Sequence, residues 1–301
     1  MSTPTEDLVR LLDLEQLEWN LFRGFSPDTE RVRTYGGEVL GQALIAAGRT
    51  VPAGRTIHSM HAYFLKLGDP SVPIVYEVDH IRDGGSFTTR RVVAIQRGKA
   101  IFNLAASFQV EEHGPDHHDP MPGVPHADDL PAGADWSDAP EPIDRTDSPH
   151  VVAAFELRPA GNLTLPGRHA EHEHPLDPDQ DVWMRVCDHL PDDPLLHAAV
   201  VAYASDLVML GTATLPHKSP GPHPGYMMAS LDHVMWFHRP CRADDWLLYH
   251  VHSPSAGAAR GFAQGQVFCA DGTLAISVAQ EGLFRPVDPT RSKAQAKLEG
   301  T

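Results

Sequence analysis

Asp206 is a single carboxylate in a long apolar segment, LLHAAVVAYASDLVML. A segment that is apolar almost all round is typical of a helix enclosed by other elements, which places Asp206 in the middle of a buried helix. Burying an unpaired carboxylate is costly, so such a residue needs hydrogen-bond partners or a chemical role. The helix alone leaves two interpretations open: a structural carboxylate that caps a loop or pairs with an arginine, or a general base.

Two polar residues on strand-like segments could join this carboxylate. Ser230 stands early in MMASLDHVMWFHRP, the first strand after the helix, and Gln280 stands within the last strand, SVAQEGLFR. If both strands face the helix, Asp206 can take a proton from a water molecule while Ser230 and Gln280 hold that water in line. Asp232 should share a face with Ser230, which makes it a second acid candidate.

The elements that must position these residues occur twice along the chain. The first half has a helix that starts near Gly36 and Gly37, followed by four strand-like runs at residues 57–67, 73–81, 86–96 and 99–110. The second half has a helix that Asp193 can cap, with Pro194 at its first position. Strands are expected before this helix at 151–157 and 181–187, and after it at 228–237, 246–252, 261–269 and 273–284.

Residues 112–149 interrupt this pattern, because they are rich in Pro, Asp, Gly and His and have no periodic apolar face. We interpret them as a linker between a first unit at 1–111 and a second unit at 150–301. One helix followed by four antiparallel strands, used twice, predicts an α+β double hotdog. In this fold each antiparallel sheet wraps around a long central helix, and the two sheets join into a larger one.

Seven stretches of the sequence carry a resemblance to a known family. They are YGGEVLGQAL, HSMHAYFLKLGDP and RDGGSFTTRRVVAIQ in the first half, and YASDL, SLDHVMWFHRP, SPSAGAARGF and QEG in the second. The chain resembles the acyl-CoA thioesterase II family of double-hotdog hydrolases. The resemblance implies hydrolysis of a fatty acyl-CoA to free acid and CoA, with an Asp, a Ser or Thr, and a Gln orienting the hydrolytic water. On this sequence those residues are Asp206, Ser230 and Gln280.

The first unit is expected to lack a second active site. Its helix has no central Asp, and the repeat places Ile57 opposite Ser230 and Ala106 opposite Gln280. Gly36 and Gly37 are instead candidates for the oxyanion donors, because a helix start presents free N–H groups. A plain turn that needs glycine is the alternative.

Three arginines could bind the phosphates of CoA, although arginine on a sheet surface is more often solvated. They are Arg90, Arg91 and Arg260.

Other classes of site are disfavoured. A net charge of -16 argues against nucleic-acid binding. Three widely spaced cysteines indicate neither disulfides nor a CxxC site, and no GxSxG motif marks a serine nucleophile. We interpret the segment RHAEHEH as a solvated loop, although it contains His169, His172 and His174. We therefore expect no metal and no cofactor.

The chain ends also bear on location. The acidic start does not read as a signal peptide, the apolar segment around Asp206 is too interrupted for a membrane span, and KLEGT is not a peroxisomal address. The expected location is the cytoplasm. The expected partner, besides acyl-CoA, is a second copy of the chain, since paired hotdogs expose sheet edges and helix faces.

Two other functions remain open. A hotdog hydratase or dehydratase needs an acid-histidine pair, but His197 lies more than two turns from Asp206. A non-catalytic acyl-CoA-binding protein would be indicated by loss of one member of the trio, and all three are present.

Overall fold

A single large antiparallel sheet dominates the computed structural model, which describes residues 2–26, 33–131, 149–160, 176–217 and 226–286. The first unit contributes α1 (Pro4–Leu12), β1 (Glu15–Glu18), β2 (Leu21–Gly24), α2 (Gly36–Gly48), β3 (Arg55–Phe64), β4 (Ile74–Asp83), β5 (Phe87–Gln96) and β6 (Lys99–Val110). The second contributes α3 (Pro149–Val152), β7 (Phe155–Pro159), β8 (Asp179–Val186), α4 (Pro194–Ser205), α5 (Met209–Thr212), β9 (Tyr226–Ser230), β10 (Asp232–Phe237), β11 (Leu247–Gly257), β12 (Arg260–Cys269) and β13 (Leu274–Pro286).

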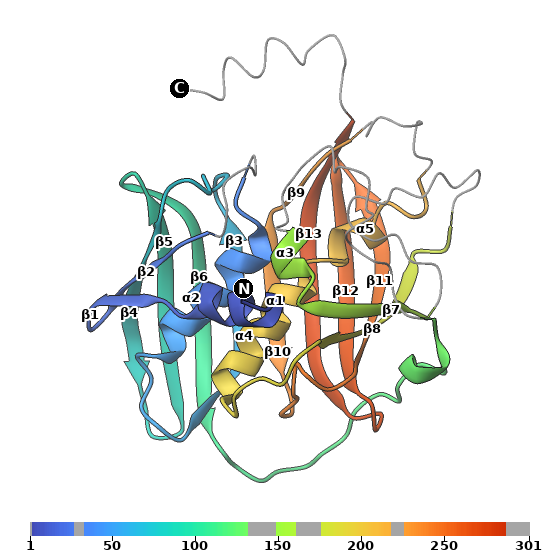
Figure 1. The fold of residues 1–301 in the computed structure, drawn as a ribbon, viewed down its shortest axis with the longest axis horizontal. Helices are drawn as coiled ribbons and strands as arrows, with labels where there is room; N and C mark the ends of the chain where they lie inside the picture. Colours follow the sequence, from blue (N-terminus) through green and yellow to red (C-terminus); the bar gives the residue numbers. More distant parts are fainter. Residues whose placement is uncertain (1, 27–32, 132–148, 161–175, 218–225, 287–301) are drawn as a thin grey trace.

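The strand order shows the two-fold repeat directly. One half runs β2-β4-β5-β6-β3 and the other runs β10-β13-β12-β11-β8, and β3 pairs with β10 at the centre. Each half is antiparallel throughout and curves around one helix, α2 in the first and α4 in the second (Figure 1). The predicted α+β double hotdog is confirmed.

The two central helices pack against each other, and glycines on α2 make the close approach possible. A Cβ on Gly37 would lie 2.3 Å from the carbonyl oxygen of Tyr203, and one on Gly41 would lie 3.1 Å from that of Ala199. Almost every residue of both helices is buried, which explains why neither has a polar face. Pro194–Thr212 is long and apolar enough to cross a membrane by composition, but 78% of its window is buried inside the protein.

The end of α4 differs from the sequence-based expectation. The helix starts as predicted, with the Asp193 side chain accepting from the N–H of Leu195 at 2.9 Å, but it ends at Ser205. Asp206 is therefore the C-cap residue and does not lie in the middle of the helix.

Two tyrosines explain this ending. The hydroxyl of Tyr35 donates to the carbonyl of Tyr203 at 3.1 Å, and that of Tyr249 donates to the carbonyl of Ser205 at 3.2 Å. The last carbonyls of a helix lack intrahelical donors, and these hydroxyls supply them from distant segments.

Several other expected boundaries are wrong in detail. Residues 151 and 152 end the short helix α3, and β7 begins only at Phe155. The expected strand 228–237 is two strands, β9 and β10, separated at Leu231. The alternation of Leu17, Trp19 and Leu21 with polar neighbours favours one half-buried strand, but this segment is a small hairpin, β1 and β2. In each case a continuous apolar pattern hides a local turn, because periodicity does not mark where hydrogen bonding changes partner.

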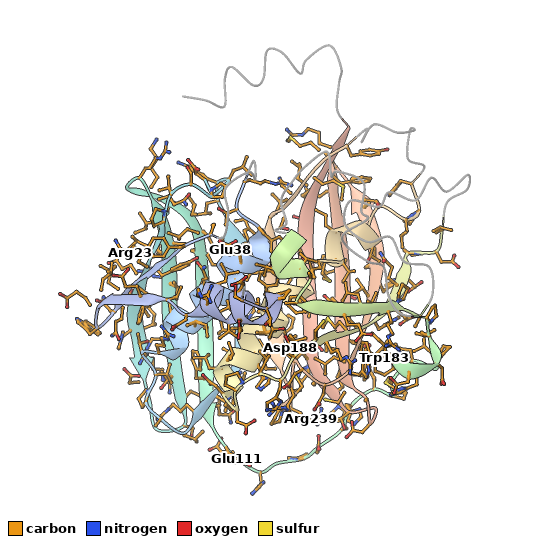
Figure 2. All side chains as sticks on the ribbon, viewed as in Figure 1. Arg23, Glu38, Glu111, Trp183, Asp188 and Arg239 are labelled. Carbon is orange, nitrogen blue, oxygen red and sulfur yellow. The ribbon has the colours of Figure 1, made fainter. Side chains whose placement is uncertain are left out.

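The part of the linker that the structure describes, residues 112–131, runs along the outside of the second unit. Met121, Val124 and Leu130 pack on a cluster that includes Trp183 and Trp246, and the indole N–H of Trp183 donates to the carbonyl of Pro125 at 2.9 Å. Figure 2 labels Trp183 and Arg239, which lie along this path, and Arg239 pairs with Asp116 of the same segment. This stretch therefore covers apolar surface on the second half of the sheet as well as connecting the units.

Candidate active site

The three predicted polar residues come together in the second unit. The carboxamide nitrogen of Gln280 donates to Asp206 Oδ1 at 2.8 Å and to Ser230 Oγ at 2.7 Å, and the hydroxyl of Ser230 donates to the same Asp206 Oδ1 at 3.1 Å. Each residue comes from a different element: the end of α4, the end of β9, and β13. Gln280 is only 2% exposed, so the group sits at the inner face of the sheet, against the helix.

A β-bulge decides which residues of the first strand reach this group. Ser230 pairs with Gly282, but Val234 pairs with Ala279, so the β9–β10 segment has one extra residue between these pairs. A bulge changes the alternation of faces. The consequence is that His233, three residues after Ser230, also points inward.

Asp232 does not share the role of Ser230, which corrects the expectation of a common face. Its carboxylate accepts the backbone N–H of Glu281 at 2.6 Å, within the bulge. Burial raises the pKa of this carboxyl. Its hydrogen bond to the main chain of β13 gives it a place in the turn between β9 and β10.

His233 and Ser205 extend the hydrogen-bond network behind Gln280. His233 Nδ1 lies 3.0 Å from Gln280 Oε1, and His233 Nε2 lies 2.9 Å from Ser205 Oγ. Both His233 and Ser205 have 0% exposure, and burial lowers the pKa of His233 to about 4. The imidazole is therefore neutral near neutral pH.

From sequence alone, His233 reads more readily as a structural residue than as a functional one. A signal for its position existed in the alternation of His233 with Met235, both of which are fully buried. Using this signal requires knowing that a new strand, with its own alternation of inward and outward side chains, begins after Leu231.

Of the two glycine candidates for the oxyanion donors, Gly36 lies beside Asp206. A Cβ on Gly36 would be 2.5 Å from Asp206 Oδ2 and 3.1 Å from the ring of Phe64. The N-cap residue of α2, Tyr35, makes no side-chain capping bond. The N-terminus of α2, with the partial positive charge of a helix start, therefore lies beside the carboxylate without a capping side chain between them. Gly37 faces α4 instead, where it permits the helix contact described above.

The arginine candidates separate into two kinds. Arg90 is 1% exposed. Its five N–H groups reach Thr50 Oγ1, the carbonyls of Thr50, Thr89 and Arg82, and Asp83 Oδ1, at 2.7–3.2 Å. A guanidinium has five donors in all, so Arg90 has none left for a phosphate and is a structural residue. Arg91 and Arg260 are exposed. Arg91 forms an ion pair with Asp79 at 2.8 Å, and Arg260 forms one with Glu281 at 2.7 Å.

Other chemistry is not assembled in the parts of the chain that the structure describes. Among those residues, no group of three or more His, Cys, Asp or Glu could hold a metal ion. His169, His172 and His174 lie outside the described residues. His197 lies near the start of α4, where its Nδ1 accepts from the N–H of Ala243 at 3.0 Å, and Asp206 lies at the opposite end of that helix.

Comparison with known proteins follows the same two-unit division. Residues 26–109 match the acyl-CoA thioesterase N-terminal domain, and residues 164–283 match the acyl-CoA thioesterase family. The chain is 41% identical to acyl-coenzyme A thioesterase 8 of Mus musculus, over 91% of this chain and 88% of the mouse protein. It is 36% identical to acyl-CoA thioesterase 2 of Haemophilus influenzae, over 95% and 99%.

Solved structures agree with this result. An acyl-CoA thioesterase II from Mycobacterium marinum superimposes with a TM-score of 0.77 at 42% identity, covering 93% of this chain and 99% of that one. The matches span both units, and the matched second unit contains Asp206, Ser230 and Gln280. The chain therefore belongs to the acyl-CoA thioesterase II family of thioester hydrolases.

Proposed function

We propose that this protein hydrolyses the thioester of fatty acyl-CoA by direct attack of a water molecule that Asp206 activates. The observation that carries the proposal is that Ser230 and Gln280, from two strands, both donate to one carboxylate oxygen of Asp206 at the end of α4. Two donors engage Oδ1, and Oδ2 points to the start of α2. We assign the carboxylate of Asp206 as the group that accepts the proton of the water.

The reaction then proceeds in two steps. The water oxygen bonds to the thioester carbon as its proton moves to Asp206, which gives a tetrahedral oxyanion. The intermediate collapses by breaking the carbon–sulfur bond, and the CoA sulfur leaves with the proton that Asp206 returns. Ser230 and Gln280 keep the carboxylate and the attacking water aligned, which reduces the entropy lost in reaching the transition state.

The oxyanion needs donors at the place where its charge develops. Gly36 supports this role because it lies beside Asp206 at an N-terminus without a side-chain cap. The N–H of Gly37 follows in the same first turn of α2. Among the arginines, Arg91 and Arg260 stay candidates for the CoA phosphates. The fatty acyl substrate and a cytoplasmic location are also part of the proposal.

Asp206→Asn tests the mechanism. The amide keeps the size of the side chain but cannot accept a proton, so kcat for thiol release from acyl-CoA should fall on the order of a hundredfold or more. Asp232→Asn is the matched control, since this carboxylate lies two residues from Ser230 but bonds to the main chain. It should keep most of its activity. Unchanged thiol release in a folded Asp206→Asn variant would contradict the proposed mechanism.

The two alternative functions make different predictions. A hydratase would consume an enoyl-CoA without releasing thiol, and a non-catalytic binder would bind acyl-CoA tightly without turnover. A hydratase is disfavoured because His197 and Asp206 lie at opposite ends of α4. A panel of saturated acyl-CoAs and 2-enoyl-CoAs, assayed for thiol release, for loss of the enoyl absorbance and for binding, separates all three.

A further inference from the structure

We infer that His233, supported by Ser205, is a positioning residue that fixes the orientation of the Gln280 carboxamide for hydrolysis. The inference rests on the proposed roles of Asp206, Ser230 and Gln280, and it extends the site to two buried residues behind them. His233 itself touches neither Asp206 nor Ser230 by any hydrogen bond given above, so its action passes through Gln280.

Counting hydrogens assigns the direction of each bond. Both hydrogens of Gln280 Nε2 are used, one toward Asp206 Oδ1 and one toward Ser230 Oγ. Gln280 Oε1 therefore faces His233 Nδ1, and because an amide oxygen only accepts, Nδ1 carries the imidazole hydrogen. A neutral imidazole then presents a lone pair at Nε2.

Ser205 determines whether that tautomer is stable. Its hydroxyl lies 2.9 Å from His233 Nε2 and 2.9 Å from the carbonyl of Ala202, so its single hydrogen can be donated to the imidazole or to the helix. Donation to Nε2 favours the Nδ1–H form. Tyr249, which donates to the carbonyl of Ser205, and α4 itself hold this serine in place.

The opposite arrangement of Gln280 would damage the site. If the carboxamide were reversed, its oxygen would face the Asp206 carboxylate, and two acceptors would oppose each other where a donor is needed. The reversed amide would also need His233 to present a lone pair at Nδ1. The imidazole tautomer and the amide orientation are therefore coupled, and the Nδ1–H form selects the productive one.

The first unit shows that the fold does not require this polar pair. Taking Phe64 as the counterpart of Phe237, His233 corresponds to Met60, and taking Gly98 as the counterpart of Gly272, Gln280 corresponds to Ala106. Met60 and Ala106 are direct partners across β3 and β6, at 0% and 1% exposure. An apolar pair fills the equivalent place in the unit for which we predict no active site.

Burying His233, Ser205 and Gln280 is unfavourable unless every polar atom is satisfied. The second unit buries His233 and Gln280 despite this cost, whereas the first unit has methionine and alanine at the equivalent positions. A chemical requirement at the site accounts for the difference better than packing does.

Two substitutions of His233 separate positioning from filling space. His233→Met introduces the residue of the first unit and removes the donor, whereas His233→Asn keeps an N–H near the place of Nδ1. We expect kcat to fall at least about tenfold in His233→Met, as when one ordinary hydrogen bond is lost from the transition state. KM should change little, and His233→Asn should restore much of the lost kcat.

A double-substitution cycle shows whether His233 acts through Gln280. In a Gln280→Ala background, His233→Met should have little further effect on kcat, because the group it positions is gone. Thermal unfolding of each variant shows whether the protein is folded at the assay temperature.

Three outcomes would overturn the inference: full kcat in folded His233→Met, equal losses in the Met and Asn variants, or additive losses in the cycle. The proposed site fails in a different way, since Gln280→Ala alone would then keep its activity.

Discussion

At the scale of single residues, buried polar groups lie behind the candidate site, and burial sets the protonation of one of them. His233 is the clearest case, because it has 0% exposure and burial lowers its pKa to about 4. The unfolded chain, with an ordinary histidine pKa near 6.5, binds a proton between these two values that the folded chain does not. The contribution of His233 to stability is therefore complete above about pH 6.5 and is lost as the pH falls toward 4.

This difference predicts a pH-dependent free energy of unfolding. Between pH 7 and about pH 4.5, the wild type should lose about 2–3 kcal/mol more than His233→Asn does. Denaturant unfolding at a series of pH values measures both. The opposite sign holds for His250, whose pKa is raised by its hydrogen bond to Asp181, so its contribution is lost as the pH rises. Parallel curves for the wild type and His233→Asn would contradict the assignment of a buried neutral histidine.

At the scale of elements, the proposed active site lies where two helix ends meet. The C-terminus of α4 delivers Asp206, and the N-terminus of α2 approaches it at Gly36. Tyr35 ties the two helices together, since it precedes α2 and its hydroxyl satisfies a carbonyl of α4. The first unit therefore supplies one wall of the proposed site.

Gly36→Ala tests this arrangement. Its methyl group would lie 2.5 Å from Asp206 Oδ2, so either the carboxylate or the start of α2 must shift. We expect kcat to fall by at least about tenfold, since misplacing a reacting group by about 1 Å can cost a hundredfold.

Gly85→Ala is the matched control, because a Cβ there would meet nothing within 4 Å, and it should leave thiol release unchanged. Equal activity in the two variants would show that Gly36 does not border the reacting atoms.

At the scale of the whole molecule, the two units share one sheet and one core. The strands β3 and β10 pair directly, and a single cluster of buried apolar residues includes α2, α4 and strands of both halves. The segment at 112–131 adds contacts to the second unit. Neither unit buries its helix without the other.

This architecture predicts a single cooperative unfolding transition. Far-ultraviolet circular dichroism reports both units, whereas fluorescence in a Trp19→Phe background is weighted toward the second unit, which contains the buried Trp183 and Trp246. Their guanidinium midpoints should coincide, as expected for one cooperative structure. Separate midpoints would mean that the units unfold independently, and Tyr35→Phe would then have no effect on the second transition.

The sequence by itself determined the class of fold and predicted three polar residues that the structure brings together. It could do so because these signals are local: a carboxylate in an apolar segment, a helix followed by four strands used twice, and motifs that resemble one family. A buried polar residue is visible in any apolar pattern, whatever its partners are.

Only the tertiary structure decided how those residues are held. Asp206 ends its helix because hydroxyls of Tyr35 and Tyr249 satisfy the final carbonyls, and no residue near Asp206 in the sequence marks that end. The extra residue between β9 and β10 turns His233 inward and leaves Asp232 to the main chain. Arg90 is removed from the phosphate candidates because five acceptor atoms, two of them on the distant Thr50, use all its donors. Each of these depends on contacts between segments far apart in the chain, which local patterns do not encode.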